Sequence, residues 1–594
     1  MRNDLVATRV TRRAVLRLLG GVAGVGLLAA CAPQAPAPAP TAAPAAAKPA
    51  EAAKPAEAAK PVDAAKPAEA AKPAEAAKPA DAAKPADAAK PAPTVVAAQP
   101  AAKPAAGDPK RGGTLKFGQN VEITTNPSTA SPLDAHNMTP ASLSATWIGY
   151  DTLLEYDDNF KPQPKLAESW DVSSDFKKIQ LKLRKGVTFH NGRDFTSEDV
   201  KYNLLRVRNP KVGAQFTNLS NWFTGIETPD PYTVVLTAEQ PRPGMFDLLI
   251  SLNMVNKDVT ETDLVTKTSG STGPFKFVEW VQGQHIRWQK NPNYWQSGKP
   301  YLDEVLIQFI PDMQSAIVRL EAGDLHAVDS PPAREAARFK NDANVKVLLV
   351  ESSGQYWVMV TNTTGGPTQN KKIRQALNYA IDRQRFIDTT LGGLSEPESL
   401  PWLPFSPAYD AAKRKQYAFD LDKAKALVAE SGVGDPSIDF VYTGVVPELV
   451  AFGQLFQADL AKIGVKLNLK GVERAVYNDL GAKFQFGLLM STSGFANLDP
   501  AALPQLSRYW DINNNLAGMN ANEQYKQLVS SASTEPDTAK RKETLGKLND
   551  LILDESFTIP VATSKHITLL RSNVNGFRFQ PGIESASYTD VWLS

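Results

Sequence analysis

Apolar residues recur at the spacings of strands and helices from residue 112 to the end of the chain. Residues 112–118 alternate apolar and polar side chains, which predicts a strand. Similar runs predict further strands at residues 178–184, 232–237, 285–289, 304–310, 346–350 and 356–361. Apolar residues three and four apart predict helices at residues 197–206, 313–322, 371–381, 421–431, 449–463 and 540–554. The mixture predicts an α/β fold with mixed sheets, and about 480 residues exceed one core, so at least two lobes are expected.

Two local patterns contain polar side chains that could be mistaken for catalytic or ligand-binding residues. Thr196 with Glu198 and Asp199 just inside a helix start is typical of a capping box, so we interpret the two acids as a cap rather than a catalytic pair. His190 precedes an Asn-Gly turn, and we expect it to pack or to support the turn. One helical face is predicted to be core, and its residues are Phe452, Leu455, Phe456, Leu460 and Ile463.

The N-terminus has the pattern of an export signal over residues 1–30. Five arginines precede an apolar run at residues 18–30, which is too short to span a bilayer. Leu28-Ala29-Ala30-Cys31 looks like a bacterial lipobox, which predicts lipidation of Cys31. The alternative is ordinary cleavage that leaves an idle thiol. Arg12-Arg13 favours twin-arginine export, with a Sec signal as the alternative.

Residues 31–110 are predicted to form a disordered tether. The chain repeats every six residues from Lys48, in units such as KPAEAA and KPADAA. Almost no side chain in this region is apolar and larger than alanine, so no core can offset the entropy of ordering. Proline in each unit opposes a continuous helix and favours a semi-rigid extended spacer. The functional alternative is a segment that binds the cell wall.

Composition narrows the classes of function. The 594 residues carry a net charge of +2, which gives no electrostatic reason to expect nucleic acid. One cysteine and five scattered histidines predict no metal site, and we expect no cofactor. A mean hydropathy of −0.29 argues against several membrane spans. No nucleophile elbow, phosphate-binding loop or HExxH motif is present, so an enzyme is not expected, although an exported hydrolase stays an alternative.

Seven sequence blocks occur in an order that resembles extracellular solute-binding protein family 5, the dipeptide, oligopeptide and nickel class of ABC-importer receptors. The fullest match is KIRQALNYAIDR at residues 372–383. The other blocks are YDTLLEY at 150–156, KLAESW at 165–170, LRKGVTFHNG at 183–192, STGPFKF at 271–277, NPNYW with PYLDEV at 291–305, and RLEAGD at 319–324.

This resemblance implies a two-lobed periplasmic-binding-protein clamp of type II, in the large form with an extra inserted subdomain. Lobe I would comprise residues 111–365, with the inserted subdomain at about 153–270, and residues 566–594 would return to it. Lobe II would comprise residues 366–565. The implied protein is a monomer that is exported and lipid-anchored at the outer face of the cytoplasmic membrane, in the periplasm or at the cell surface. It would deliver a small-molecule solute to an ABC permease and ATPase complex. A surface sensor, adhesin or chaperone is the alternative use of the same clamp.

The resemblance also bears on the solute. Peptide-binding members hold the peptide ammonium on an aspartate that lies a few residues before an acid-proline pair. The matching stretch here, residues 490–500, offers no carboxylate except Asp499 of the Asp-Pro turn. The amine anchor is therefore predicted to be absent, which favours an oligosaccharide or another small polar molecule over an oligopeptide. Candidate ligand contacts are Trp402, Phe495, Asn497, Tyr356, Trp357 and Trp222, for each of which core packing is the alternative.

Overall fold

The computed structural model describes residues 108–594, except for residues 121, 123–132, 137–146, 264–269, 351–353, 445, 495–497, 514 and 583–584. The predicted signal peptide, Cys31 and nearly all of the tether lie outside the described residues. Within the described ranges, no helix is long and apolar enough to cross a membrane.

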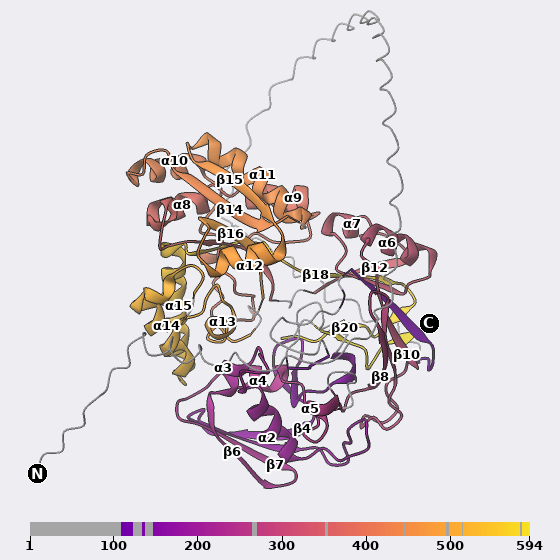
Figure 1. Ribbon diagram of the computed structural model, residues 1–594. Helices are drawn as coiled ribbons and strands as arrows, with labels where there is room; N and C mark the ends of the chain where they lie inside the picture. The colour runs from indigo at the N-terminus through magenta and orange to yellow at the C-terminus, as the bar shows by residue number, and fades with distance from the viewer. Residues whose placement is uncertain are drawn as a thin grey trace, which may run out of the picture. The chain divides into compact units, whose positions relative to one another are not determined.

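A seven-stranded mixed sheet forms the first lobe (Figure 1). In spatial order its strands are β12 (Val345–Val350), β18 (His566–Arg571), β11 (Ala327–Asp329), β1 (Thr114–Gln119), β10 (Glu304–Phe309), β9 (His285–Lys290) and β8 (Phe275–Val281). β1 runs parallel to both β10 and β11, and the other pairs are antiparallel. Two helices, α6 (Met313–Ala322) and α7 (Ala333–Ala337), share an apolar cluster with β11, β12 and β18. The C-terminal residues add the short pairs β19 (Val574–Asn575) with β22 (Trp592–Leu593) and β20 (Arg578–Phe579) with β21 (Ala586–Ser587).

A subdomain is inserted into this lobe and has a core of its own. Its antiparallel sheet has the order β4 (Ala167–Val172), β5 (Lys178–Leu183), β7 (Thr233–Ala238) and β6 (Phe223–Asp230). The hairpin of β2 (Leu154–Tyr156) and β3 (Pro162–Pro164) precedes it. The helices are α2 (Ser197–Arg206), α3 (Thr217–Ser220) and α4 (Phe246–Ser251), followed by α5 (Thr260–Asp263).

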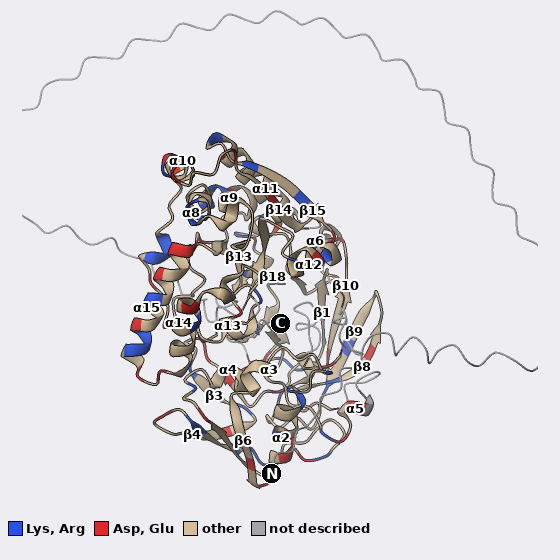
Figure 2. Cartoon of the chain, turned by 60° about the vertical axis from the view of Figure 1, so that its left-hand side comes forward, with Lys and Arg blue, Asp and Glu red and all other residues tan. Residues whose placement is uncertain are grey.

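A five-stranded sheet forms the second lobe. Its order is β15 (Lys466–Val472), β14 (Ser437–Thr443), β16 (Leu488–Ser493), β13 (Tyr356–Thr361) and β17 (Thr558–Thr563). One apolar cluster involves α8 (Lys371–Tyr379), α9 (Arg383–Thr390), α10 (Leu421–Glu430) and α11 (Pro447–Lys462). The other involves α12 (Arg474–Ala482), α13 (Leu503–Leu506), α14 (Glu523–Thr534) and α15 (Thr538–Glu555). Charged residues lie along the outer side of α15 (Figure 2).

The chain passes between the two sheets twice. It leaves the first sheet after β12, and it returns between β17 and β18. The sequence placed the end of lobe I at residue 365, but β13 pairs with β16 and β17 of the second sheet, so the first passage lies before Tyr356. All six residues of β13 are buried, so its sequence carries no alternation that would assign it to one lobe.

The bounds of several helices agree with those predicted from the sequence. α2 and α6 have the predicted bounds, and α11 begins two residues early at Pro447, in the first helical turn where proline is favoured. The core face of α11 is confirmed, because Phe452, Phe456 and Leu460 are buried. The cap is confirmed too, because the Asp199 carboxylate accepts from the Thr196 N–H at 3.0 Å.

Candidate functional site

One segment of the second lobe packs into the core of the inserted subdomain. Residues 498–506 follow β16, yet Leu498 and Ala502 belong to the same apolar cluster as α2, α4 and the four-stranded sheet. Leu498 is 4% exposed and Ala502 is fully buried. The side chain of Asn218 also donates to the Gln505 carbonyl at 2.9 Å. The lobes are therefore in direct contact across the cleft that separates their sheets.

A buried carboxylate lies at this contact. Asp247 of α4 accepts from the Asp499 N–H at 2.8 Å and from the Tyr156 hydroxyl at 2.9 Å. The Asp499 side chain pairs with Arg541 of α15. Burial, with the Asp499 charge adding to it, raises the pKa of Asp247 to about 7. Asp247 therefore holds its proton in this arrangement once the pH falls below about 7.

We expect the contribution of Asp247 to the stability of the chain to fall as pH rises from about 4 to 7. A carboxyl whose pKa is raised on folding binds more protons when native, so the stabilisation is complete below its unfolded value of about 4 and is lost as pH passes 7. One such proton changes the free energy of unfolding by at most about 1.4 kcal/mol per pH unit. Asp247→Asn should reduce this slope, measured by urea unfolding at several pH values. An unchanged slope would contradict the assignment.

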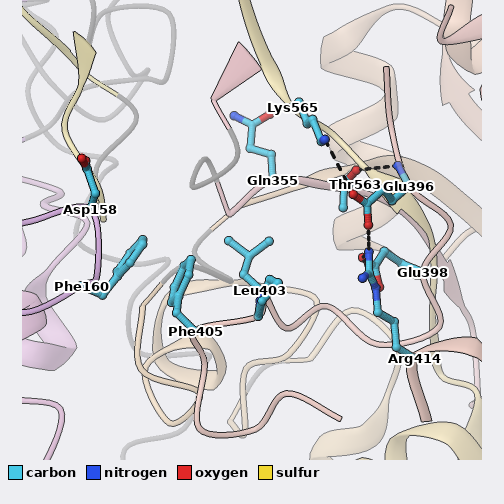
Figure 3. A pocket seen from close by; sticks show the side chains of 11 residues that line it. Asp158, Phe160, Gln355, Glu396, Glu398, Leu403, Phe405, Arg414, Thr563 and Lys565 are labelled. Carbon is cyan, nitrogen blue, oxygen red and sulfur yellow. Dashed lines mark hydrogen bonds and ion pairs between the residues drawn. The ribbon is translucent and has the colours of Figure 1, made fainter. Parts of the chain in front are cut away.

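A pocket of about 200 Å³ opens beside the β2–β3 hairpin, which also carries Tyr156 (Figure 3). The inserted subdomain contributes Asp158 and Phe160, and the segments where the chain passes between the lobes contribute Gln355, Thr563 and Lys565. The segment between α9 and α10 completes the wall. Its lining residues are Glu396, Glu398, Leu403, Pro404, Phe405 and Arg414. The pocket thus has walls from both lobes.

Two phenylalanines bridge the lobes at this pocket. Phe160, at the tip of the β2–β3 hairpin, stacks on Phe405 with ring centroids 3.4 Å apart and an interplanar angle of 15°. Figure 3 shows the two rings side by side. Phe405 is 37% exposed, which is unusual for a large apolar side chain in this molecule. The backbone of Phe160 is left-handed, with φ of 57°, so the hairpin tip is held in a conformation that few side chains favour.

The polar wall of the pocket is an ion cluster. The Nε of Arg414 donates to both Glu398 oxygens at 2.7 Å, and its Nη2 lies 2.6 Å from Glu396. Lys565 lies 3.9 Å from Glu396. Burial raises the pKa of Glu398 to about 7, although Arg414 opposes the shift. Glu396 is more open to solvent, and despite partial burial the Arg414 charge keeps its pKa below the usual value. The pocket therefore offers both charges together with an aromatic face.

The predicted ligand contacts are found in cores wherever they are described. Trp402 is 2% exposed and its indole N–H donates to Asn549 at 2.6 Å. The Tyr356 hydroxyl accepts from the Trp510 indole at 2.7 Å, and Trp510 lies 6.2 Å from Trp402, so the structure brings these residues together inside the second lobe. Trp357 packs edge-on to Phe386.

The remaining candidate residues are Trp222, which is described, and three that are not. Trp222 is buried in the inserted subdomain under the Arg242 guanidinium, 5.2 Å from its ring. Phe495, Asn497 and Cys31 lie outside the described residues. Core packing accounts for the contacts of Trp402, Tyr356 and Trp222, whereas Trp357 also lines a second pocket of about 220 Å³ beside Gln355 and Lys565. The roles of all these residues as ligand contacts stay predictions.

The sequence did not single out the residues that line the pocket. Phe160, Phe405, Glu396 and Arg414 come from separate segments, and their pairing depends on the way the lobes meet. The positive φ of Phe160 has no signature in its residue type. No cluster of three or more metal-ligating side chains occurs among the described residues.

Comparisons with known proteins relate this chain to a protein family. The family model described as "Bacterial extracellular solute-binding proteins, family 5 Middle" matches residues 161–515. The glutathione-binding protein GsiB of Salmonella paratyphi A is 27% identical over 478 residues, which cover 78% of this chain and 92% of that protein. GsiB of Escherichia coli O1:K1 is 26% identical with the same coverage.

Two solved structures have the same fold. AgaA from A. tumefaciens R10, in complex with agropinic acid, is 26% identical with a TM-score of 0.68, covering 81% of this chain and 99% of that one. AppA from Bacillus subtilis, in complex with a nonapeptide, is 22% identical with a TM-score of 0.70, covering 82% and 100%. The two-lobed arrangement of the sheets is thus common to these proteins.

Proposed function

The chain belongs to the bacterial extracellular solute-binding proteins of family 5 and serves as the extracytoplasmic receptor of an ABC importer, and we propose that it captures a peptide-sized or oligosaccharide-like solute between its two lobes. The observation that carries this proposal is the pocket at Phe160 and Phe405, which has walls from both lobes. A solute seated there touches both lobes and so favours their approach.

The solute class is supported by chemistry at the pocket and by the relatives. An aromatic face beside Glu396, Arg414 and Lys565 suits a small polar solute with an apolar portion. The relatives include glutathione-binding proteins, and the similar structures hold agropinic acid or a nonapeptide. The Asp499 carboxylate is engaged by Arg541, which agrees with the expectation that it is not a peptide-amine anchor.

Thermal melting of the full chain against a solute panel tests the capture function. The panel comprises glutathione, the tetrapeptide Ser-Thr-Ser-Ala, maltotriose and Ni(L-His). A solute at 100 times its Kd stabilises the native state by about 2.7 kcal/mol, which raises the melting temperature visibly. We expect at least one of the first three to do so. Failure of all of them would contradict the proposed solute class.

We also infer that the receptor is tethered to the membrane through lipid on Cys31, by twin-arginine export, and that it works as a monomer. The lipobox sequence and the low-complexity residues 31–110 support this arrangement. The mass of the mature N-terminal peptide tests it, because an unmodified Cys31 would exclude the anchor. A sensor, adhesin or chaperone role is not favoured by any described feature.

A further inference from the structure

The second lobe presents one edge of its sheet to the cleft. β14 runs parallel to both β15 and β16, so the carboxyl ends of these three strands lie at the same edge. The chain enters α12 at Arg474 directly after β15, and after β16 it reaches the segment 498–506 that contacts the inserted subdomain. In open α/β sheets, ligands bind outside the carboxyl ends of the strands. Figure 1 shows α12 and α13 on the side of this sheet that is turned toward the first lobe.

A group of hydroxyls is gathered at this edge. The phenol oxygens of Tyr477 on α12 and Tyr509 lie 3.3 Å apart. Both residues are buried, with exposures of 1% and 5%. The hydroxyl of Ser491 on β16 hydrogen-bonds with both phenols.

Two arginines converge on the same phenols. The Arg508 guanidinium lies 5.3 Å from the Tyr509 ring centroid and 5.9 Å from that of Tyr477. Arg474 lies 5.9 Å from the Tyr477 centroid. Both arginines are exposed.

Neither arginine is neutralised by an acid within the part of the chain that the structure describes. The Arg508 guanidinium hydrogen-bonds with two phenol oxygens, that of Tyr509, 3.4 Å from Nη2, and that of Tyr477. Arg414 and Arg541 of the same lobe, by contrast, each pair with a carboxylate. Although burial opposes ionisation, the Arg508 charge lowers the pKa of Tyr509 below its usual value. The edge is therefore a locally positive surface lined with hydroxyls.

We propose that Arg508 and Arg474, with the hydroxyl groups of Tyr477, Tyr509 and Ser491, bind a carboxylate of the captured solute. This inference rests on the proposed capture function and narrows its solute to an organic acid. The planar fork of a guanidinium matches the two oxygens of a carboxylate, and charge-assisted hydrogen bonds of this kind are stronger than neutral ones. A neutral oligosaccharide would leave two cations without a counter-charge at the closed cleft.

Matched probe pairs test the carboxylate site on the full chain. Binding is measured by calorimetry for Ser-Thr-Ser-Ala and its C-terminal amide, for glutathione and its diethyl ester, and for maltotriose. We expect an acid to bind the natural chain, and Arg508→Gln to weaken it about 10- to 100-fold, as for loss of a hydrogen bond to a charged group. The amide or ester should bind the natural chain about 10- to 100-fold more weakly than the acid does. Its affinity should fall little further in Arg508→Gln. Arg474→Gln should act in the same direction.

Control variants separate this role from a structural one. Arg338→Gln changes an exposed arginine of the first lobe and should leave every affinity unchanged. The melting temperature of the ligand-free Arg508→Gln chain should match that of the natural chain, because the residue is exposed. Equal losses for acid and amide would overturn the carboxylate site while leaving capture intact. Binding of maltotriose alone would do the same, and binding of no probe would overturn the proposed function together with this inference.

Discussion

Leu498→Asp is expected to weaken solute binding by about 100-fold or more. Leu498 belongs to the second lobe by sequence, but it is buried in the apolar cluster of the inserted subdomain. Burying an unpaired carboxylate in such surroundings costs several kcal/mol. The chain can avoid this cost by moving the lobes apart, so solute binding would have to supply it, and each 1.4 kcal/mol is a tenfold loss of affinity.

The measurement is the affinity of a panel solute that stabilises the natural chain. Phe419→Asp is the matched control, because Phe419 lies just before α10 of the same lobe and is 41% exposed. That variant should bind as the natural chain does. Affinity of Leu498→Asp within threefold of the natural chain would show that contact between the lobes is not needed for capture.

The second large effect concerns stability, and it arises at Arg383. This guanidinium is buried at the start of α9 and donates to the carbonyls of Glu398, at 2.7 Å, and of Pro560, at 3.1 Å. It also donates to the carbonyls of Asn378, at 3.1 Å, and Tyr417, at 3.0 Å. Burial lowers the pKa of Arg383 to about 10, which still leaves it charged at neutral pH. One side chain thus joins β17, α8 and the loop that carries the pocket acids.

Arg383→Met should lower the free energy of unfolding by at least about 3 kcal/mol. Each buried carbonyl left without a donor costs about 1–3 kcal/mol, and methionine supplies none. Urea unfolding followed by tryptophan fluorescence measures the loss. Arg338→Met, at a side chain that is 57% exposed, should change it by less than about 0.5 kcal/mol. A loss at Arg383 no larger than the control would mean that water replaces the guanidinium.

Local patterns predicted six helices and seven strands, because helix caps and apolar spacing act over a few residues. They did not predict β14, β15, β16 and β17, which complete the second sheet beside β13. The Thr196–Asp199 cap and the core face of α11 are examples, and the family blocks extended this local information to the two-lobed fold.

Contacts between distant segments could not be predicted in the same way. Trp402 stands in a proline-rich loop that suggests exposure, but Asn549, 147 residues further on, accepts its N–H. Phe160 and Phe405 meet only because the lobes meet. In the sequence, Arg508 resembles any surface arginine. Only the three-dimensional structure shows that no acid among the described residues pairs with it. The candidate site is therefore largely a product of tertiary arrangement.

The central claim is that solute draws the two lobes together. The most direct measurement is the distance between spin labels at two exposed positions, Glu227→Cys in the inserted subdomain and Val476→Cys in the second lobe, in a Cys31→Ser background. We predict a broad distribution without solute that narrows to a single shorter distance when a panel solute binds. Binding that leaves the distribution unchanged would contradict the claim.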